Sequence, residues 1–132
     1  HGDVLTDLNL ERLAKFHADE KPAASMVVKL RLAEKKYGKV VMQGNKIVEF
    51  VGATDDRGIS VVNGGVYIFN SDIADYIPSK TPSYLEKDVF PALAKQGKLS
   101  AYIYQGICFD VSRPESYKKA LKQWKGVKKG RG

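Results

Sequence analysis

The 132-residue chain has room for one domain with a buried core, and its 43% apolar and 28% charged residues are ordinary for a globular protein. No apolar run approaches the length that crosses a membrane, and no secretory signal opens the chain, so we expect no membrane contact. The single cysteine, Cys108, lies on a strand predicted to be buried and has no second cysteine to pair with. A reducing cytoplasm is therefore the expected compartment.

The net charge of +7 comes from the C-terminal end of the chain. Residues 112–132 carry eight basic side chains and one acidic side chain, and the rest of the chain is balanced. A solvated helix face followed by a basic tail over 126–132 explains this excess, and an arm that binds nucleic acid or another polyanion is the alternative. No aromatic residues are interleaved with the tail lysines, which argues against a surface that stacks on nucleic-acid bases.

The first predicted element is a helix with Asp7 as its N-cap, running to about Asp19. Its apolar face, which begins at Leu10, has helical spacing and ends at His17. We expect His17 to be a structural residue rather than a base or a metal ligand.

Strands are predicted in the middle of the chain. Apolar and β-branched residues over 24–32 and 59–70 predict two of them. Between these, strands over 39–42 and 47–51 flank the turn formers Gly44-Asn45, which is typical of a β-hairpin.

Three helices and two strands are predicted after residue 70. Two of the helices open on Ser-x-x-Glu, the spacing of a capping box, at Ser83 and Ser112. Pro91 predicts a kink or a late start in the first of these. The predicted elements are a short helix over 70–77, a helix from 83 to 97, strands over 99–104 and 107–110, and a helix from 112 to about 125.

Alternating strands and helices predict an α/β fold, and the hairpin predicts a mixed β-sheet flanked by helices. We expect one domain over residues 1–125, followed by the basic tail over 126–132.

Two acidic residues stand directly before predicted helices. Asp110 ends an apolar strand, and Asp3 lies at the very start of the chain. A carboxylate at the carboxyl end of a strand lies where ligands of α/β folds collect, and two carboxylates that converge suit Mg²⁺ and a substrate phosphate. Either acid alone could instead be a turn or helix-cap residue.

Five short motifs accompany these acids in a fixed order. They are His1-Gly2-Asp3, Tyr37–Val41 with Ile47–Phe50, Asn63–Tyr67, Leu85–Pro91, and Phe109-Asp110 with Pro114-Glu115-x-Tyr117. This series resembles the later half of the sugar-1-phosphate nucleotidylyltransferases, and within that family the mannose-1-phosphate and heptose-1-phosphate guanylyltransferase type. The resemblance covers nearly all of residues 1–125 and implies the C-terminal half of a Rossmann-like nucleotidyltransferase domain.

The resemblance implies an enzyme that forms a nucleoside-diphosphate sugar and pyrophosphate from a nucleoside triphosphate and a sugar 1-phosphate. The cofactor it implies is Mg²⁺, which offsets the charge gathering at the α-phosphorus. The residues it assigns are Asp3 and Asp110 for Mg²⁺, Asn63 and Gly64 for contact with the sugar, and Glu86 and Lys87 near the sugar. Two of these have structural alternatives: Gly64-Gly65 could form a β-bulge, and Glu86 could complete the capping box.

The chain departs from the family in two places. Where the family continues after Phe50 with Phe-x-Glu-Lys-Pro, this chain has Gly52-Ala53-Thr54, so a carboxylate and a cation for the sugar phosphate are missing, and Lys87 or Arg57 are candidate replacements. The glycine-rich loop that holds the triphosphate is also absent from the 132 residues. We therefore expect the chain to be inactive alone, and to form a homo-oligomer or pair with an N-terminal half.

Two other functions remain open from the sequence. The first is a non-catalytic sugar-phosphate-binding or regulatory module of the same fold, which the loss after Phe50 favours. The second is a polyanion-binding protein that works through the basic tail.

Overall fold

The computed structural model describes residues 2–32, 38–52, 58–79 and 81–126. It confirms the alternation of strands and helices. Several positions named above lie outside the described part, namely His1, Tyr37, Ala53, Thr54, Arg57 and residues 127–132 of the tail. The elements are β1 (Val4–Thr6), α1 (Leu10–Glu20), β2 (Ala24–Leu32), β3 (Lys39–Gln43), β4 (Lys46–Val51), β5 (Ile59–Phe69), η1 (Ser71–Tyr76), η2 (Leu85–Val89), α2 (Phe90–Lys95), β6 (Leu99–Ile103), β7 (Cys108–Asp110) and α3 (Pro114–Gln123).

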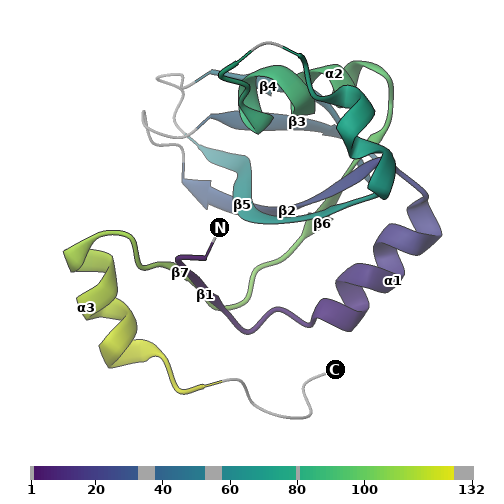
Figure 1. Ribbon diagram of the computed structural model, residues 1–132. Coiled ribbons are helices and arrows are strands. Elements are labelled where there is room, and N and C mark those ends of the chain that lie inside the picture. The colour runs from purple at the N-terminus through teal and green to yellow at the C-terminus, as the bar shows by residue number, and fades with distance from the viewer. Residues whose placement is uncertain (1, 33–37, 53–57, 80, 127–132) are drawn as a thin grey trace.

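Five strands form a mixed sheet that closes on itself in the order β2-β5-β3-β4-β6 (Figure 1). β2 is antiparallel to β5 and parallel to β6, and β3 and β4 form the predicted hairpin. The pairing of Lys46 on β4 with Ser100 on β6 completes the circle. The predicted fold class is confirmed.

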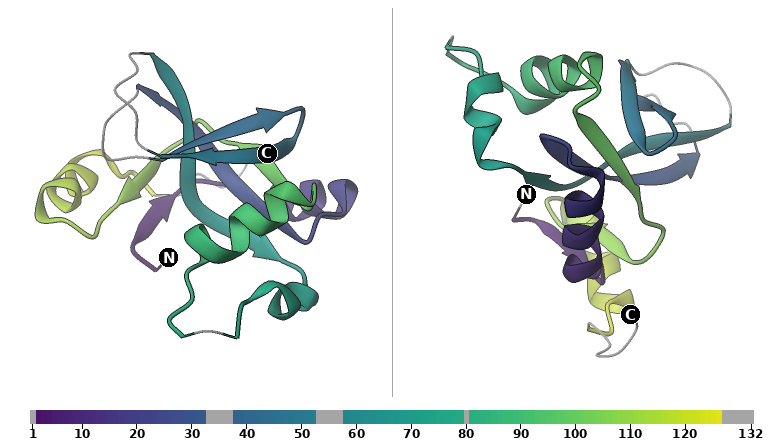
Figure 2. Two further views of the ribbon diagram at one scale, coloured as in Figure 1. Left: turned by 90° about the horizontal axis from the view of Figure 1, so that it is seen from above. Right: turned by 90° about the vertical axis from the view of Figure 1, so that its right-hand side faces the viewer.

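The remaining two strands form a separate antiparallel ribbon, β1–β7. Val4 is opposite Asp110 in its register, so the start of the chain lies beside the end of the last strand. Figures 1 and 2 show this ribbon and α3 at the opposite end of the molecule from α2. The ribbon thus brings the two predicted metal ligands to one place.

Phe90, the first residue of α2, is the centre of the larger core. Its side chain is fully buried, and its ring lies 5.0 Å from that of Tyr67 and 6.3 Å from that of Phe50 between centroids. Leu13 of α1 packs with Val27 of β2 in a second, smaller cluster. Burial of this apolar surface is the main force that fixes the helices against the sheet.

The N-cap predicted at Asp7 is wrong, because Asn9 caps α1 through its side chain. The Asp7 carboxylate instead accepts hydrogen bonds from the Ile107 amide at 2.8 Å and from the Tyr104 hydroxyl. These partners lie about a hundred residues away in the sequence, so no local pattern could have shown them.

Neither predicted capping box forms. Arg113 precedes α3 without a side-chain cap, while Pro114 occupies the first turn, where its fixed φ suits a helix. Ser83 donates its hydroxyl to Pro78 at 3.2 Å, and a π-helical turn, η2, precedes α2. The late start predicted from Pro91 is confirmed.

His17 is structural, as the sequence predicts. Its Nδ1 lies 2.8 Å from the Ser25 hydroxyl and its Nε2 lies 2.7 Å from the Asn70 side-chain oxygen. The imidazole therefore ties α1 to β2 and to the start of η1. Cys108 is half-buried rather than buried, because it belongs to the narrow ribbon and not to the closed sheet.

Candidate functional site

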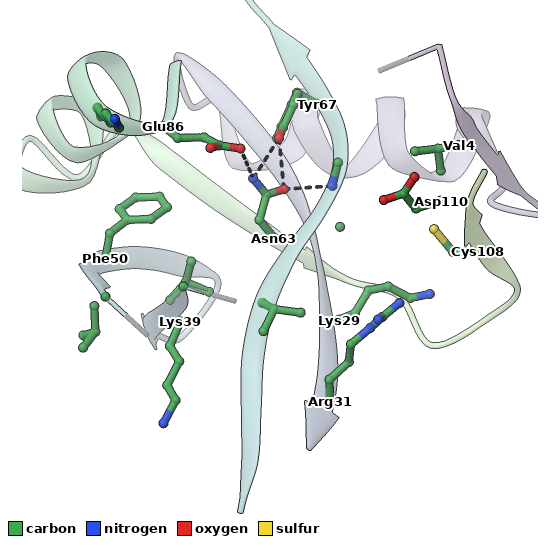
Figure 3. Close-up of a pocket in the computed structure, with 18 of the residues that line it drawn as sticks. Val4, Lys29, Arg31, Lys39, Phe50, Asn63, Tyr67, Glu86, Cys108 and Asp110 are labelled. Atoms are coloured by element: carbon green, nitrogen blue, oxygen red, sulfur yellow. Dashed lines mark hydrogen bonds between the residues drawn. The ribbon is translucent and has the colours of Figure 1, made fainter. Parts of the chain in front are cut away.

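The site is a cavity of about 630 Å³ between the closed sheet, the β1–β7 ribbon and η2 (Figure 3). Apolar walls with a few convergent polar groups are typical of small-molecule sites. All of the residues selected from the sequence line it, namely Asp3, Asn63, Gly64, Glu86, Lys87 and Asp110.

Asn63 lies at the centre of a hydrogen-bonded group. Its amide nitrogen donates to the Tyr67 hydroxyl at 2.8 Å and to Glu86 Oε1 at 3.5 Å, and its oxygen accepts from the Gly65 amide at 2.8 Å. Burial raises the pKa of Tyr67, so its hydroxyl keeps its proton. Side chains held in this way can present donors and acceptors to sugar hydroxyls.

The glycines after Asn63 form the β-bulge that the sequence left as an alternative. The β2–β5 register shifts between Met26 and Val28, and a Cβ on Gly64 would lie 2.8 Å from the Val27 carbonyl oxygen. Gly65 has a φ of 77°, which favours glycine. The bulge turns Asn63 toward the cavity, so the structural interpretation and the site are compatible.

Glu86 and Lys87 differ in their surroundings. Glu86, without a capping role, extends toward Asn63 (Figure 3). Lys87 also lines the cavity, and its Nζ lies 5.1 Å from the centroid of the Tyr84 ring in a cation–π contact. Glu86 is therefore the stronger of the two candidates for contact with a ligand.

Asp110 is held in place by the residue that follows its strand. The Ser112 hydroxyl and the Ser112 amide both donate to Asp110 Oδ1, which leaves Oδ2 with no such bond. These hydrogen bonds, with smaller contributions from the charges of Arg113 and Arg31, hold the pKa of Asp110 below its usual value. The carboxylate is thus ionised and points into the cavity (Figure 3).

The pair Asp3 and Asp110 fits a magnesium ion by its donor chemistry. Both residues supply carboxylate oxygens to one cavity. Over the described ranges, no cluster of three or more His, Cys, Asp or Glu side chains that could hold a metal is found. Mg²⁺ retains several waters and commonly takes one or two carboxylates together with substrate phosphates, so two are sufficient.

Five polar or charged lining residues were not selected from the sequence: Lys29, Arg31, Lys39, Tyr67 and Cys108. Tyr67 stands inside a quoted motif, and its hydroxyl could have been noted there. Lys29 and Arg31 interrupt the apolar run of β2 at alternate positions, which places them on one face. Only the fold shows that this face borders the cavity.

A closed mixed sheet with two acids and a polar network at one cavity defines an α/β fold with a small-molecule site, and comparison with known proteins shows its family. The family model described as "Nucleotidyl transferase" matches residues 1–125. The chain belongs to this family, as a member of the sugar-1-phosphate nucleotidylyltransferases.

The sequence is similar to two mannose-1-phosphate guanylyltransferases. It is 31% identical over 119 residues to the mannose-1-phosphate guanylyltransferase catalytic subunit beta of Xenopus tropicalis, covering 89% of this chain and 33% of that protein. It is 33% identical over 127 residues to the mannose-1-phosphate guanyltransferase of Gibberella zeae, with the same coverage of 89% and 33%. The chain thus spans about a third of the length of the curated relatives it matches.

Solved structures share the fold. A putative glucose-1-phosphate thymidylyltransferase from Bacillus anthracis superposes with a TM-score of 0.75 at 18% identity, covering 98% of this chain and 55% of that one. HddC from Yersinia pseudotuberculosis gives a TM-score of 0.72 at 22% identity, covering 94% of this chain and 53% of that one.

Within the part of the chain that is described, no helix has the length and apolar content needed to cross a membrane.

Proposed function

We propose that this chain is the sugar- and metal-binding half of an enzyme that forms a nucleoside-diphosphate sugar and pyrophosphate from a nucleoside triphosphate and a sugar 1-phosphate. The observation that carries this proposal is the convergence of Asp3, Asn63, Glu86 and Asp110 on one cavity from four separate segments. Family membership supports nucleotidyl transfer in general. The names of the relatives favour mannose 1-phosphate as the first ligand to test.

The chemistry needs positioning more than a covalent nucleophile. A phosphate oxygen of the sugar 1-phosphate attacks the α-phosphorus of the triphosphate, and the bond to the pyrophosphate group breaks. Asn63, Tyr67 and Glu86 would orient the sugar hydroxyls so that this oxygen is presented in line. Asp3 and Asp110 would hold Mg²⁺, which supplies positive charge to the phosphates when bound.

We propose that the chain needs a nucleotide-binding partner for activity, because no glycine-rich triphosphate loop occurs in the 132 residues. Exposed apolar side chains on α3 and on or beside the β1–β7 ribbon support an interface there, either with such a nucleotide-binding half or with a second copy of this chain. They are Leu5, Ile107, Tyr117 and Leu121. If the chain sediments strictly as a monomer, the proposed homo-oligomer is ruled out. A cytoplasmic location stays a proposal that the single cysteine supports.

The test is calorimetric titration of mannose 1-phosphate into the chain with and without Mg²⁺. We expect Mg²⁺ to tighten binding, and Asp110→Asn to abolish that effect, while Asp75→Asn, an exposed acid on η1 away from the cavity, leaves it intact. Tight binding that ignores Mg²⁺ would favour the non-catalytic module, which the glycine at position 52 also favours.

Two further measurements separate the remaining possibilities. Deletion of residues 126–132 should leave sugar-phosphate binding unchanged, whereas a polyanion-binding protein would lose its salt-dependent binding. The intact mass of the protein purified from its source will show whether a nucleotide-binding segment accompanies these 132 residues. A heavier species can be assayed directly for pyrophosphate release.

A further inference from the structure

Lys29 is the one charged side chain among the buried residues that the structure describes, with 8% of its surface exposed. A buried ammonium is costly unless it is paired with an opposite charge or hydrogen-bonded. Its Nζ lies 3.5 Å from the Gly106 carbonyl oxygen, which is long for a hydrogen bond. Across the ranges that are described, no ion pair joins Lys29 to a carboxylate. Its compensation within the protein comes instead from the Gly106 carbonyl, the Cys108 thiol and the charge of Asp7.

The surroundings of Lys29 include a second cation. Burial lowers the pKa of Lys29, the neighbouring Cys108 thiol raises it, and the positive charge of Arg31 lowers it. Figure 3 shows Lys29 and Arg31 adjacent, on the side of the cavity where Cys108 and Asp110 lie. Two cations held together facing a cavity are stabilised when an anion binds between them.

The position of Lys29 and Arg31 can be compared with the order of groups in a sugar 1-phosphate, in which the phosphate follows the sugar ring. Lys29 is paired with Val62 across β2–β5, and its neighbour Val28 is paired with Asn63. Because side chains alternate along a strand, Lys29 extends from the face opposite to that of Asn63, and both residues line the same cavity. Asp110, the proposed metal ligand, lies close enough for the charge of Arg31 to lower its pKa. A phosphate on the anomeric carbon of a sugar would occupy this intermediate place.

The other candidate cations are less well placed. Lys87 lines the cavity but contacts the Tyr84 ring, and Arg57 lies outside the described residues. Lys39 of β3 also lines the cavity, and in Figure 3 its side chain extends away from Asn63 and Asp110. Gly52, the residue that follows β4, lines the cavity without a side chain. At this cavity β4 therefore supplies no charged side chain, whereas β2 supplies two cations.

We propose that Lys29, assisted by Arg31, binds the phosphate of the sugar 1-phosphate and so replaces the cation that the segment after Phe50 lacks. This inference rests on the proposed function, because it assumes that a sugar phosphate enters the cavity. Lys29 contributes a buried point charge, and Arg31 offers a planar donor group that fits phosphate oxygens.

The experiment titrates the 132-residue chain with mannose 1-phosphate, mannose and inorganic phosphate at constant ionic strength. Lys29→Met keeps the volume and removes the charge, Arg31→Gln changes an exposed residue with little risk to folding, and Lys118→Gln on α3 is the matched control. We expect Lys29→Met to weaken the binding of mannose 1-phosphate and of inorganic phosphate at least about tenfold. Mannose affinity should not change, and Lys118→Gln should behave as the wild type.

The outcomes separate this inference from the proposed function. If Lys29→Met and Arg31→Gln bind mannose 1-phosphate normally while Asn63→Ala does not, the Lys29 assignment is overturned and the function stands. If phosphate binding depends on Lys29 but Asn63→Ala has no effect on mannose 1-phosphate, the anion site stands and the sugar-phosphate function fails. A wild-type chain that binds none of the three ligands overturns both. Should the Lys29→Met protein fail to fold, two other measurements test the assignment: the affinity of Arg31→Gln for mannose 1-phosphate, and the NMR shifts of the wild-type Lys29 side chain on addition of phosphate.

Discussion

The Val111 amide donates a hydrogen bond of 2.8 Å to the Asp3 carbonyl oxygen, so the backbone of one proposed metal ligand is bonded to the residue that follows the other. This contact extends the β1–β7 ribbon by one step beyond the Val4–Asp110 pair. The two acids are therefore fixed relative to each other by main-chain geometry. Their relative position does not depend on side-chain packing alone.

Metal binding should require both acids. We expect Asp3→Asn and Asp110→Asn each to weaken the binding of Mn²⁺ by about tenfold or more, because each removes a charged oxygen ligand. Mn²⁺ is used here as a paramagnetic substitute for Mg²⁺. The measurement is the Mn²⁺-induced broadening of NMR signals from cavity residues. Asp75→Asn serves as the control. Equal broadening in all three variants would show that the ion binds elsewhere.

The pKa of Asp110 should depend on Ser112. We expect Ser112→Ala to raise that pKa toward the usual value of about 3.9, in part only, because the Ser112 amide still donates to Oδ1. Since the folded-state pKa is depressed, the stabilisation is present above the unfolded value and is lost as pH falls through the folded value. The variant should therefore be less stable at neutral pH, and its smaller loss of stability on acidification should end at a higher pH.

An NMR titration of the Asp110 carboxyl carbon measures this directly. Ser116→Ala is the matched control, since the Ser116 hydroxyl donates to the Arg113 carbonyl at 3.1 Å and makes no hydrogen bond to Asp110. An unchanged Asp110 titration in Ser112→Ala would contradict the assigned cause.

Gly64 should tolerate no side chain. We expect Gly64→Ala to destabilise the fold by about 1–3 kcal/mol, because its Cβ would lie 2.8 Å from the Val27 carbonyl oxygen and force the bulge apart. Gly52→Ala, on the same cavity but with no atom within 4 Å of the added Cβ, should change stability by no more than about 0.5 kcal/mol. Urea unfolding curves compare the two. Equal stabilities would show that the β5 backbone adjusts freely.

His17 should matter for stability and not for the ligand. We expect His17→Ala to cost about 1–3 kcal/mol, because it leaves the buried Ser25 hydroxyl and the Asn70 side chain without a shared partner. Lys15→Ala on the same helix breaks only an exposed ion pair with Asp19, and should cost at most about 1 kcal/mol. A stable His17→Ala protein with impaired mannose 1-phosphate binding would make His17 a functional residue instead.

Local chemistry in the sequence determined the individual elements. The hairpin over β3 and β4 was predictable because the sequence Gly44-Asn45 predicts a tight turn, and Gly44 adopts the φ of 59° that this turn requires. The strand over 24–32 has the bounds that its apolar run predicts. The candidate residues Asp3, Asn63, Glu86 and Asp110 were also found from the sequence, since they belong to ordered motifs that the family shares.

Only the tertiary structure decided how these elements close around the cavity. The pairing of Lys46 with Ser100 and the hydrogen bonds of Asp7 join residues far apart in the chain, and their free energy is gained only when the whole sheet forms. The same holds for Lys29, which in the sequence is a single interruption of an apolar strand. Its place beside Asp110 and Arg31 follows from the contact of β2 with the segment that leads into β7, at Gln105 and Gly106, and nothing local to residue 29 records that contact.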